Sequence, residues 1–274
     1  MNLQLRYEEE HALLRAEARR WLDERFPISR VRALADSEPG EDPADWKELA
    51  ALGWLGLVVP EKHGGAGLGA LHLAVLMEET GRRLLPSPLL PSTLAALALV
   101  LDGSEAQRER WLPAIASGEA RVVLASGASI WGAERADALI APERAELRVI
   151  ETRTPGLAIE PEIVLDRTRR SARVTQAGVP HVATAPSDRL AAGACVALSA
   201  EMAGGADALL ALTAAYAATR EQFGKPIGSF QAVKHPLVNV LLGVEGLRSL
   251  VYAAASALDA QSPDAETLAR MAKA

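Results

Sequence analysis

One short stretch of the chain, beginning at Arg220, concentrates side chains that can bind an anionic cofactor. It carries a guanidinium at Arg220, amides at Gln222 and Gln231, and aromatic rings at Phe223 and Phe230. A guanidinium can donate two parallel hydrogen bonds to a phosphate. We therefore predict that this stretch contacts an extended, negatively charged cofactor.

Two long helices are expected to hold this stretch between them. Over residues 195–219 and again over 233–258, apolar side chains recur at alternating steps of three and four, which is the spacing of one helix face. Pro226 lacks an amide donor and disfavours helix at Lys225, so the helical run is interrupted there. The pattern predicts two antiparallel helices of a bundle. The first apolar face consists of Cys195, Leu198, Met202, Gly205, Leu209, Leu212, Tyr216 and Thr219.

Further motifs precede these helices in order along the chain. They are Leu-Val-Val-Pro-Glu-Lys-His-Gly-Gly-Ala-Gly at 57–67, Glu-Glu-Thr-Gly at 78–81 and Trp-Leu-Pro-Ala-Ile-Ala-Ser-Gly-Glu at 111–119. With Arg-Glu-Gln-Phe-Gly at 220–224, they make the chain resemble the acyl-CoA dehydrogenase family of flavoproteins. In that family, Arg-x-Gln-Phe-Gly followed by a helix with an early glutamine is a recurrent signature. The resemblance covers most of the chain.

The resemblance and the residue pattern together predict a mainly α fold with a small β middle domain. Residues 1–118 are interpreted as an N-terminal helical domain, with helices at Leu3–Arg25, Asp45–Leu52, Leu68–Arg82 and Ser104–Ala116. Residues 119–188 are interpreted as a shortened β domain, and residues 189–274 as an incomplete C-terminal helical bundle. The strands are expected at Arg121–Leu124, Ala138–Ile140, Leu147–Ile150, Gly156–Ile159, Ile163–Leu165, Ala172–Thr175 and His181–Ala183.

The middle domain departs from the family pattern. The resemblance implies a larger barrel, in which a Thr-Glu-Pro-Gly-x-Gly-Ser-Asp loop and a Lys-x-Trp-Ile-Thr strand hold the flavin ring. Here residues 125–131 stand where that loop would begin, and residues 132–137 already resemble a later segment. We therefore expect the flavin-cradling half of the barrel to be absent. Trp131 either stacks against a ring system or belongs to the core, and the core is the commoner place.

The C-terminal bundle is also expected to be short. Ser262 and Pro263 predict the start of a third helix, because serine caps helices and proline fits the first helical position. Only about 12 residues follow, or roughly 18 Å of helix. The family continues to a fourth helix with a glycine-rich flavin contact. We expect the shortened barrel and bundle to leave apolar faces that a partner covers.

The chemistry that the resemblance implies needs a carboxylate. Dehydrogenation of an acyl thioester requires a base for the α proton while flavin accepts the β hydride. In most of the family this glutamate lies in the missing C-terminal part; in a minority it lies where this chain has Ala194. Glu201, Asp207 and Glu245 are the nearest acidic substitutes on the two helices, but each lies off the apolar face, which favours a solvated or inter-subunit role. No catalytic residue is assigned to this chain.

The resemblance implies FAD as the cofactor and acyl-CoA as the substrate. Arg220 resembles the residue that meets the FAD pyrophosphate of a neighbouring subunit, and Gln222, Phe223 and Gln231 would complete the contact. The alternative is that Arg220 only caps the helix C-terminus while Phe223 packs under the turn. No metal ligand set is assigned.

Two hypotheses about function follow. In the first, the chain is one subunit of an FAD-dependent acyl-CoA dehydrogenase of fatty acid or steroid side-chain catabolism, and it lends Arg220 to a flavin held mainly by a homo- or hetero-oligomeric partner. Such an enzyme passes its electrons to an acceptor flavoprotein. In the second, the chain is a non-catalytic scaffold that has lost FAD binding. A third possibility, which cuts across both hypotheses, is that the sequence is a truncated piece of an ordinary enzyme of the family.

Composition excludes several other classes. The 29 Lys and Arg against 35 Asp and Glu give a net charge of −6 without a basic block, so no nucleic-acid partner is expected. Cys195 is the sole cysteine and is expected to be a small buried residue. Residues 190–218 read as a bundle helix rather than a membrane span, and residues 64–67 as a turn. The start of the chain lacks the apolar core of a secretion signal, so a cytoplasmic location is expected.

Overall fold

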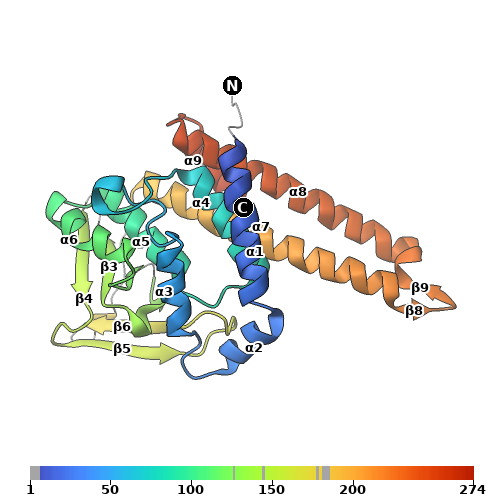
Figure 1. Ribbon diagram of the computed structural model, residues 1–274, viewed down its shortest axis with the longest axis horizontal. Helices are drawn as coiled ribbons and strands as arrows, with labels where there is room; N and C mark the ends of the chain where they lie inside the picture. The colour runs from blue at the N-terminus through green and yellow to red at the C-terminus, as the bar shows by residue number, and fades with distance from the viewer. Residues whose placement is uncertain (1–6, 126, 144–145, 177–178, 181–185) are drawn as a thin grey trace.

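The structure is a computed structural model that describes residues 7–274 except 126, 144–145, 177–178 and 181–185. The described chain is mainly helical, with small β-sheets beside the helices and a two-helix arm that extends to one side (Figure 1). The predicted fold class, mainly α with a small β part, is confirmed.

Most of the predicted N-terminal helices are present. The sequence predicts α1, α3, α4 and α6 to within a few residues of their observed bounds, although residues 3–6 lie outside the described part. It misses α2, which follows Pro27, and α5, which follows Pro86 and Pro88. A proline in the first turn, such as Pro91 in α5, removes no intrahelical hydrogen bond. The observed helices are α1 (Glu9–Arg25), α2 (Ile28–Asp36), α3 (Pro43–Ala51), α4 (Ala70–Arg83), α5 (Leu89–Asp102) and α6 (Glu105–Ala116).

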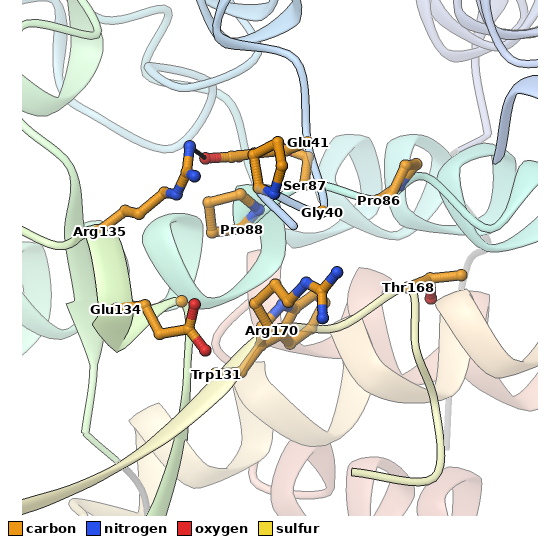
Figure 2. Close-up of a pocket in the computed structure, with 12 residues that line it drawn as sticks. Gly40, Glu41, Pro86, Ser87, Pro88, Trp131, Glu134, Arg135, Thr168 and Arg170 are labelled. Carbon is orange, nitrogen blue, oxygen red and sulfur yellow. Dashed lines mark ion pairs between the residues drawn. The ribbon is translucent and has the colours of Figure 1, made fainter. Parts of the chain in front are cut away.

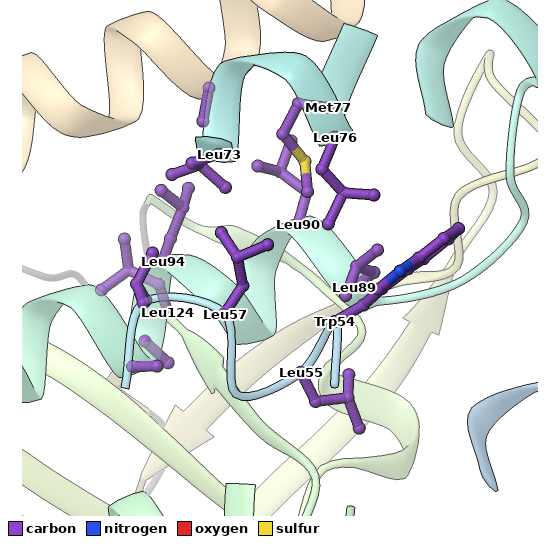
Figure 3. Close-up of a cluster of buried hydrophobic side chains, with 14 of the residues drawn as sticks. Trp54, Leu55, Leu57, Leu73, Leu76, Met77, Leu89, Leu90, Leu94 and Leu124 are labelled. Carbon is purple, nitrogen blue, oxygen red and sulfur yellow. The ribbon is translucent and has the colours of Figure 1, made fainter. Parts of the chain in front are cut away.

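Helix α4 lies at the centre of the core. Figure 3 shows its leucines and Met77 above α5 and above the loop that precedes α4. These side chains belong to one continuous cluster that also reaches the first strand. The side chains labelled in Figure 3 are Trp54, Leu55, Leu57, Leu73, Leu76, Met77, Leu89, Leu90, Leu94 and Leu124, all of them buried.

Two glycines let α4 approach α7 (Asp188–Thr219) at backbone contact. A Cβ atom on Gly204 would overlap the carbonyl oxygen of Glu78 and lie 2.8 Å from its carbonyl carbon. A Cβ atom on Gly81 would overlap the carbonyl oxygen of Glu201 and lie 2.7 Å from its carbonyl carbon. The glycine of the Glu-Glu-Thr-Gly motif is therefore a helix-packing residue.

The first glutamate of the same motif ties three helices together. Glu78 is 3% exposed, and its carboxylate accepts hydrogen bonds from Arg15 of α1 at 2.8 Å and from Arg248 of α8 (Gln231–Asp259) at 2.7 Å. The hydroxyl of Tyr252 donates to the same carboxylate. Because a buried carboxylate without partners is costly, this network fixes α1 and α8 against α4.

The β part consists of two small sheets. One has the order β1-β3-β4, with β1 parallel to β3, and the other has the order β2-β6-β5, with β7 beside β6. The predicted strand at residues 163–165 is wrong: Ile163 and Leu165 are fully exposed in the connection after β5, where no described layer covers them. The sequence misses β2 and β7, and its strand at 181–183 lies outside the described residues. The strands are β1 (Val122–Leu124), β2 (Ser129–Trp131), β3 (Ala138–Glu143), β4 (Glu146–Glu151), β5 (Leu157–Glu162), β6 (Ser171–Gln176) and β7 (Val179–Pro180).

The C-terminal helices form the arm seen at the right of Figure 1. Helices α7 and α8 are antiparallel as predicted, and α9 (Ala265–Lys273) packs on the half of the pair that is nearest the core. Helix α9 starts after Asp264 rather than at Ser262, whose hydroxyl accepts from the Asp264 amide at 3.3 Å. By length and composition alone α7 and α8 could each cross a membrane, a test that core helices of soluble proteins also pass.

Candidate functional site

The predicted cofactor-contacting residues lie at the far end of the arm (Figure 1). Arg220 is the last residue before a short hairpin of β8 (Glu221–Gln222) and β9 (Lys225–Pro226). Between the strands, Phe223 and Gly224 have φ angles of 54° and 76°. Positive φ at both central residues is the geometry of a type I′ hairpin turn, which matches the twist of the two strands. A non-glycine residue such as Phe223 adopts it rarely.

The four side chains predicted to contact the cofactor are all exposed to solvent. The Arg220 amide donates to the carbonyl of Tyr216 at 2.8 Å, whereas its guanidinium has no hydrogen bond or ion pair with any residue that the structure describes. Phe223 is 92% exposed, so the alternative in which it packs under the turn is wrong. Gln222 and Gln231 are exposed as well, and the Gln222 amide only reaches the neighbouring carbonyl at 2.8 Å.

A lysine that the sequence analysis did not select belongs to the same corner. The Lys225 ammonium lies 4.4 Å from the centroid of the Phe230 ring, and the Phe230 and Phe223 rings meet edge to face at 6.1 Å. A cation over an aromatic face is attracted to it. The connection between α7 and the start of α8 therefore offers two cations, two amides and an exposed ring at the end of the arm. Lys225 could have been found from its place inside the Arg-x-Gln-Phe-Gly-Lys stretch.

The three acidic residues that the sequence analysis considered on the two long helices are all paired with arginines. Arg248 lies 3.2 Å from Asp207 and also pairs with Glu245. Glu201 accepts from Arg169 at 2.6 Å, and its side chain is only 13% exposed. Burial raises the pKa of Glu201, although Arg169 opposes the rise. The prediction of a solvated role is therefore wrong for Glu201, which α7 turns toward the loop before β6.

Arg169 links the β part to α7, a role that the sequence analysis missed. Its guanidinium stacks over Trp131 at 4.4 Å while it pairs with Glu201, and it lies 3.0 Å from Asp166. The Trp131 ring is thus covered by a cation of its own chain and packs against the main core. Ala194 is half-buried against the same core. Only an arginine-rich run at 167–173 hinted at this contact.

The pocket around Trp131 is almost filled. Figure 2 shows Arg170 lying across it between Trp131 and the loop at Ser87. Arg170 donates to the carbonyl of Ala35 at 3.3 Å, and a Cβ on Gly40 would overlap its Nε and lie 2.8 Å from its Cγ. The remaining cavity of about 20 Å³ has room for little more than a water molecule. This pocket does not accommodate a flavin or an acyl chain.

The loop of glycines at 64–67 is a turn, as predicted. The amides of Gly65, Ala66 and Gly67 donate to carbonyls of residues 56–60 at 2.8 to 3.4 Å. Gly64 and Gly67 have φ angles of 83° and 63°, which favour glycine. Because these amides are already used inside the protein, they do not form a phosphate cradle.

A cluster of Glu10, His11 and His72 between α1 and α4 is the group in the described residues that comes nearest to a metal site. The two imidazole rings are tilted by 35° with their centroids 4.0 Å apart, and His72 lies 3.3 Å from Glu10. The amide of Glu8 donates to Nδ1 of His11 at 3.1 Å, so in the neutral ring Nε2 carries the hydrogen. His11 therefore caps the start of α1 through Nδ1.

Comparisons with known families match both ends of the chain. The sequence profile of the acyl-CoA dehydrogenase N-terminal domain matches residues 8–119, and that of the acyl-CoA dehydrogenase C-terminal domain matches residues 191–274. The chain is 36% identical over 248 residues to acyl-CoA dehydrogenase IpdE2 of Mycolicibacterium smegmatis, which covers 89% of this chain and 76% of that protein. It is 34% identical over 267 residues to IpdE2 of Mycobacterium tuberculosis, covering 96% and 80%.

Solved structures give the same result. The Tcur3481-Tcur3483 steroid ACAD G363A variant superimposes with a TM-score of 0.85 at 32% identity, covering 97% of this chain and 82% of that chain. The ChsE4-ChsE5 complex of Mycobacterium tuberculosis superimposes with a TM-score of 0.85 at 24% identity, covering 98% and 83%, which supports the fold alone.

Proposed function

The chain belongs to the acyl-CoA dehydrogenase family of flavin-dependent oxidoreductases, and we propose that it acts as the subunit with the shortened middle domain in a heteromeric member. In this proposal the chain supports α,β-dehydrogenation of an acyl-CoA thioester by contacting FAD that a more complete partner subunit holds. The likeness to the Tcur3481-Tcur3483 steroid ACAD variant supports this assignment.

The free guanidinium at the end of the arm carries the proposal. Arg220 has no described side-chain partner, and Phe223 beside it is 92% exposed. A fold gains nothing by holding a bulky aromatic residue at positive φ in solvent, because both the backbone strain and the exposed ring cost free energy. The cost is explained if a second molecule covers the corner.

The residues of the corner fit FAD chemically. Arg220, with Lys225 near it, would hold the pyrophosphate, and Gln222 and Gln231 would hydrogen-bond its polar edges. Phe223 would cover a flat part of the cofactor. FAD supplies the hydride acceptor of the reaction. The chain's own contribution is to bind the negatively charged end of the cofactor and to exclude water from it.

We also propose that this chain supplies no catalytic base. Ala194 occupies the position where some relatives would carry one, and Glu201 is held by Arg169. Proton abstraction then falls to the partner subunit. The acyl-CoA would bind beside that subunit's flavin, because the pocket around Trp131 is filled by Arg170. The reduced flavin would pass its electrons to an acceptor flavoprotein, and we propose a cytoplasmic location.

The second candidate function is a scaffold without flavin contact. The stacking of Arg169 over Trp131 favours the scaffold, because the Trp131 ring is then not free to bind a flavin ring. Under this alternative the three parts of the chain, 1–118, 119–188 and 189–274, serve only assembly.

The decisive experiment is co-expression with a family member that has the glutamate and the flavin loop this chain lacks. We expect a yellow complex in which Arg220→Ala weakens FAD retention roughly 10- to 100-fold, the worth of a charged hydrogen-bonded contact. Arg220→Lys keeps the positive charge but loses the paired donors of the guanidinium, so its FAD retention should fall between that of the parent complex and that of Arg220→Ala. A complex that retains FAD equally in all three forms, or that binds no FAD, would refute the proposal and leave the scaffold.

A further inference from the structure

A second and much larger pocket lies where the start of α9 meets α5 and the start of α4 (Figure 1). Its cavity measures about 620 Å³, which is the size of a small-molecule site, whereas the pocket around Trp131 keeps only about 20 Å³. Among the described residues, none that surrounds Trp131 and none of the predicted cofactor-contacting side chains lines the larger pocket. It is therefore a separate site.

The floor of this pocket is apolar. On α5, the half-buried side chains Leu97, Val100 and Leu101 are three and four positions apart, so one face of the helix is turned toward the cavity. Leu258, at the end of α8, is half-buried in the same pocket. A ligand that covers these side chains removes apolar surface from water, which is favourable in proportion to the area covered.

The walls of the pocket are held in place by contacts within the chain. The carboxylate of Asp259, at the end of α8, accepts from the amides of Ala70 and Leu71 at 2.6 and 3.0 Å, which fixes α8 to the start of α4. Arg270 of α9 lies 3.2 Å from Asp188 of α7, which joins two further walls. The cavity is therefore pre-formed, as small-molecule sites usually are.

Two charged side chains at the mouth of the pocket have no partner in the part of the chain that the structure describes. Arg189, in the first turn of α7, is exposed, and Glu266, in the first turn of α9, is half-buried. Neither makes a described hydrogen bond or ion pair. The carboxylate of Asp259 is already used by the amides of α4. The mouth therefore offers one free cation and one free anion.

The two free charges differ in how well they suit their helices. The first turn of a helix carries partial positive charge, so an acid such as Glu266 is favourable there and a cation such as Arg189 is unfavourable. The starts of α4, α7 and α9 all line the pocket, and their positive ends add to the charge of Arg189. A bound anion would compensate this positive charge.

The mouth favours a carboxylate among anions. A guanidinium binds a carboxylate through two parallel hydrogen bonds. Glu266 repels an anion in proportion to its charge, so a head group with a single charge is favoured over a phosphate or a coenzyme A tail. An extended peptide is a poorer occupant, because its backbone needs hydrogen-bond partners and the amides of residues 65–68 already donate to carbonyls of residues 56–60.

We propose that this pocket binds a small apolar monocarboxylate as the free anion, with its apolar body on the α5 floor and its carboxylate at Arg189. The site goes beyond the proposed function, because it lies apart from the end of the arm and is formed by this chain alone.

Isothermal titration of the full chain with decanoate, decanol and decyl phosphate tests the head group. Decanoate should bind. Decanol has the same apolar body without the charge, so it should bind roughly 5- to 10-fold more weakly, because an exposed charged contact contributes about that much. Decyl phosphate should also bind more weakly than decanoate. Absence of decanoate binding, or equal affinity for the three compounds, would overturn the proposal.

Arg189→Gln tests the position of the carboxylate, with Arg153→Gln as the matched control. Arg153 is also exposed and without a described partner, but it lies in the turn between β4 and β5. Arg189→Gln should lower the affinity for decanoate to that for decanol and leave the affinity for decanol unchanged. Arg153→Gln should change neither affinity. If the two variants bind decanoate equally well, the carboxylate does not lie at Arg189 and the proposal fails.

Val100→Trp tests the apolar floor by filling it. In a variant whose circular dichroism spectrum matches the parent, binding of both decanoate and decanol should be lost; binding at the parent affinity would place the ligand elsewhere and overturn the proposal. The Arg189 and Arg153 pair decides the question by itself if Val100→Trp does not fold. FAD retention by the Arg220 variants is a separate measurement, so failure of one proposal leaves the other standing.

Discussion

Replacing two adjacent glycines of α7 by alanine should change stability in opposite directions. Gly204 and Gly205 lie in the same helix, and each Gly→Ala change stabilises a helix by about 0.5–1 kcal/mol through backbone entropy. Their surroundings differ. A Cβ at 204 would overlap the Glu78 carbonyl and lie 2.9 Å from the Arg82 amide nitrogen, whereas a Cβ at 205 would have its nearest neighbour, the carbonyl oxygen of Gly81, at 3.6 Å.

The clash at 204 cannot be relieved by a side-chain rotation, because both neighbours are backbone atoms of α4. The helices must separate, and overpacking of this kind costs about 1–3 kcal/mol or more. Separation would also strain Arg248, which donates to Glu78 of α4 at 2.7 Å and lies 3.2 Å from Asp207 of α7. We expect Gly204→Ala to lower the free energy of unfolding by about 1–3 kcal/mol net, and Gly205→Ala to raise it by about 0.5 kcal/mol.

Urea unfolding followed by circular dichroism measures both variants against the parent chain. The midpoints should move apart while the slopes stay equal, because the surface exposed on unfolding is unchanged. Equal stabilisation in both variants would refute the backbone contact between α4 and α7 and, with it, the packing role given to the Glu-Glu-Thr-Gly motif.

Two further predictions concern pH. Burial raises the folded-state pKa of Glu201, so the folded chain holds this proton more tightly than the unfolded chain. The free energy of unfolding should therefore fall as pH rises from the ordinary carboxyl range through the raised pKa. Glu201→Gln should flatten this dependence when unfolding is measured from about pH 4 upward. If the free energy of unfolding of the parent chain rises with pH in this range, the burial of Glu201 is contradicted. Burial and then His11 lower the folded-state pKa of His72, so stability should fall as pH drops below the ordinary histidine value of about 6.5, and His72→Gln should remove that loss. Thermal melts at pH 7.5 and 5.5 measure this loss as a difference in melting temperature. If the difference is the same in the variant and in the parent chain, His72 is not its source.

The sequence determined the long helices and the order of the parts, because these depend on local rules. The three-and-four spacing over 195–219 and 233–258, broken at Pro226, is enough for two helices and a turn between them. The motifs that carry the family resemblance are read in the same local way. Helix α5 was not predicted, because prolines are typical of loops and the sequence does not show that those of α5 stand at its start and in its first turn.

Only the tertiary structure decided what each side chain meets. Glu201 appears solvated by its position in the pattern, yet Arg169, distant in the sequence, arrives beside it from the β part and leaves it buried. The apolar face of α7 is evident in the sequence, but periodicity does not say whether the same chain covers it, and around Leu212 the described chain does not. Arg220 is the C-cap residue of α7, and only the fold shows that its side chain stands at the end of an arm without a described partner; its contact with a cofactor stays a prediction. Burial and pairing arise from contacts between distant segments, and a local pattern carries no information about them.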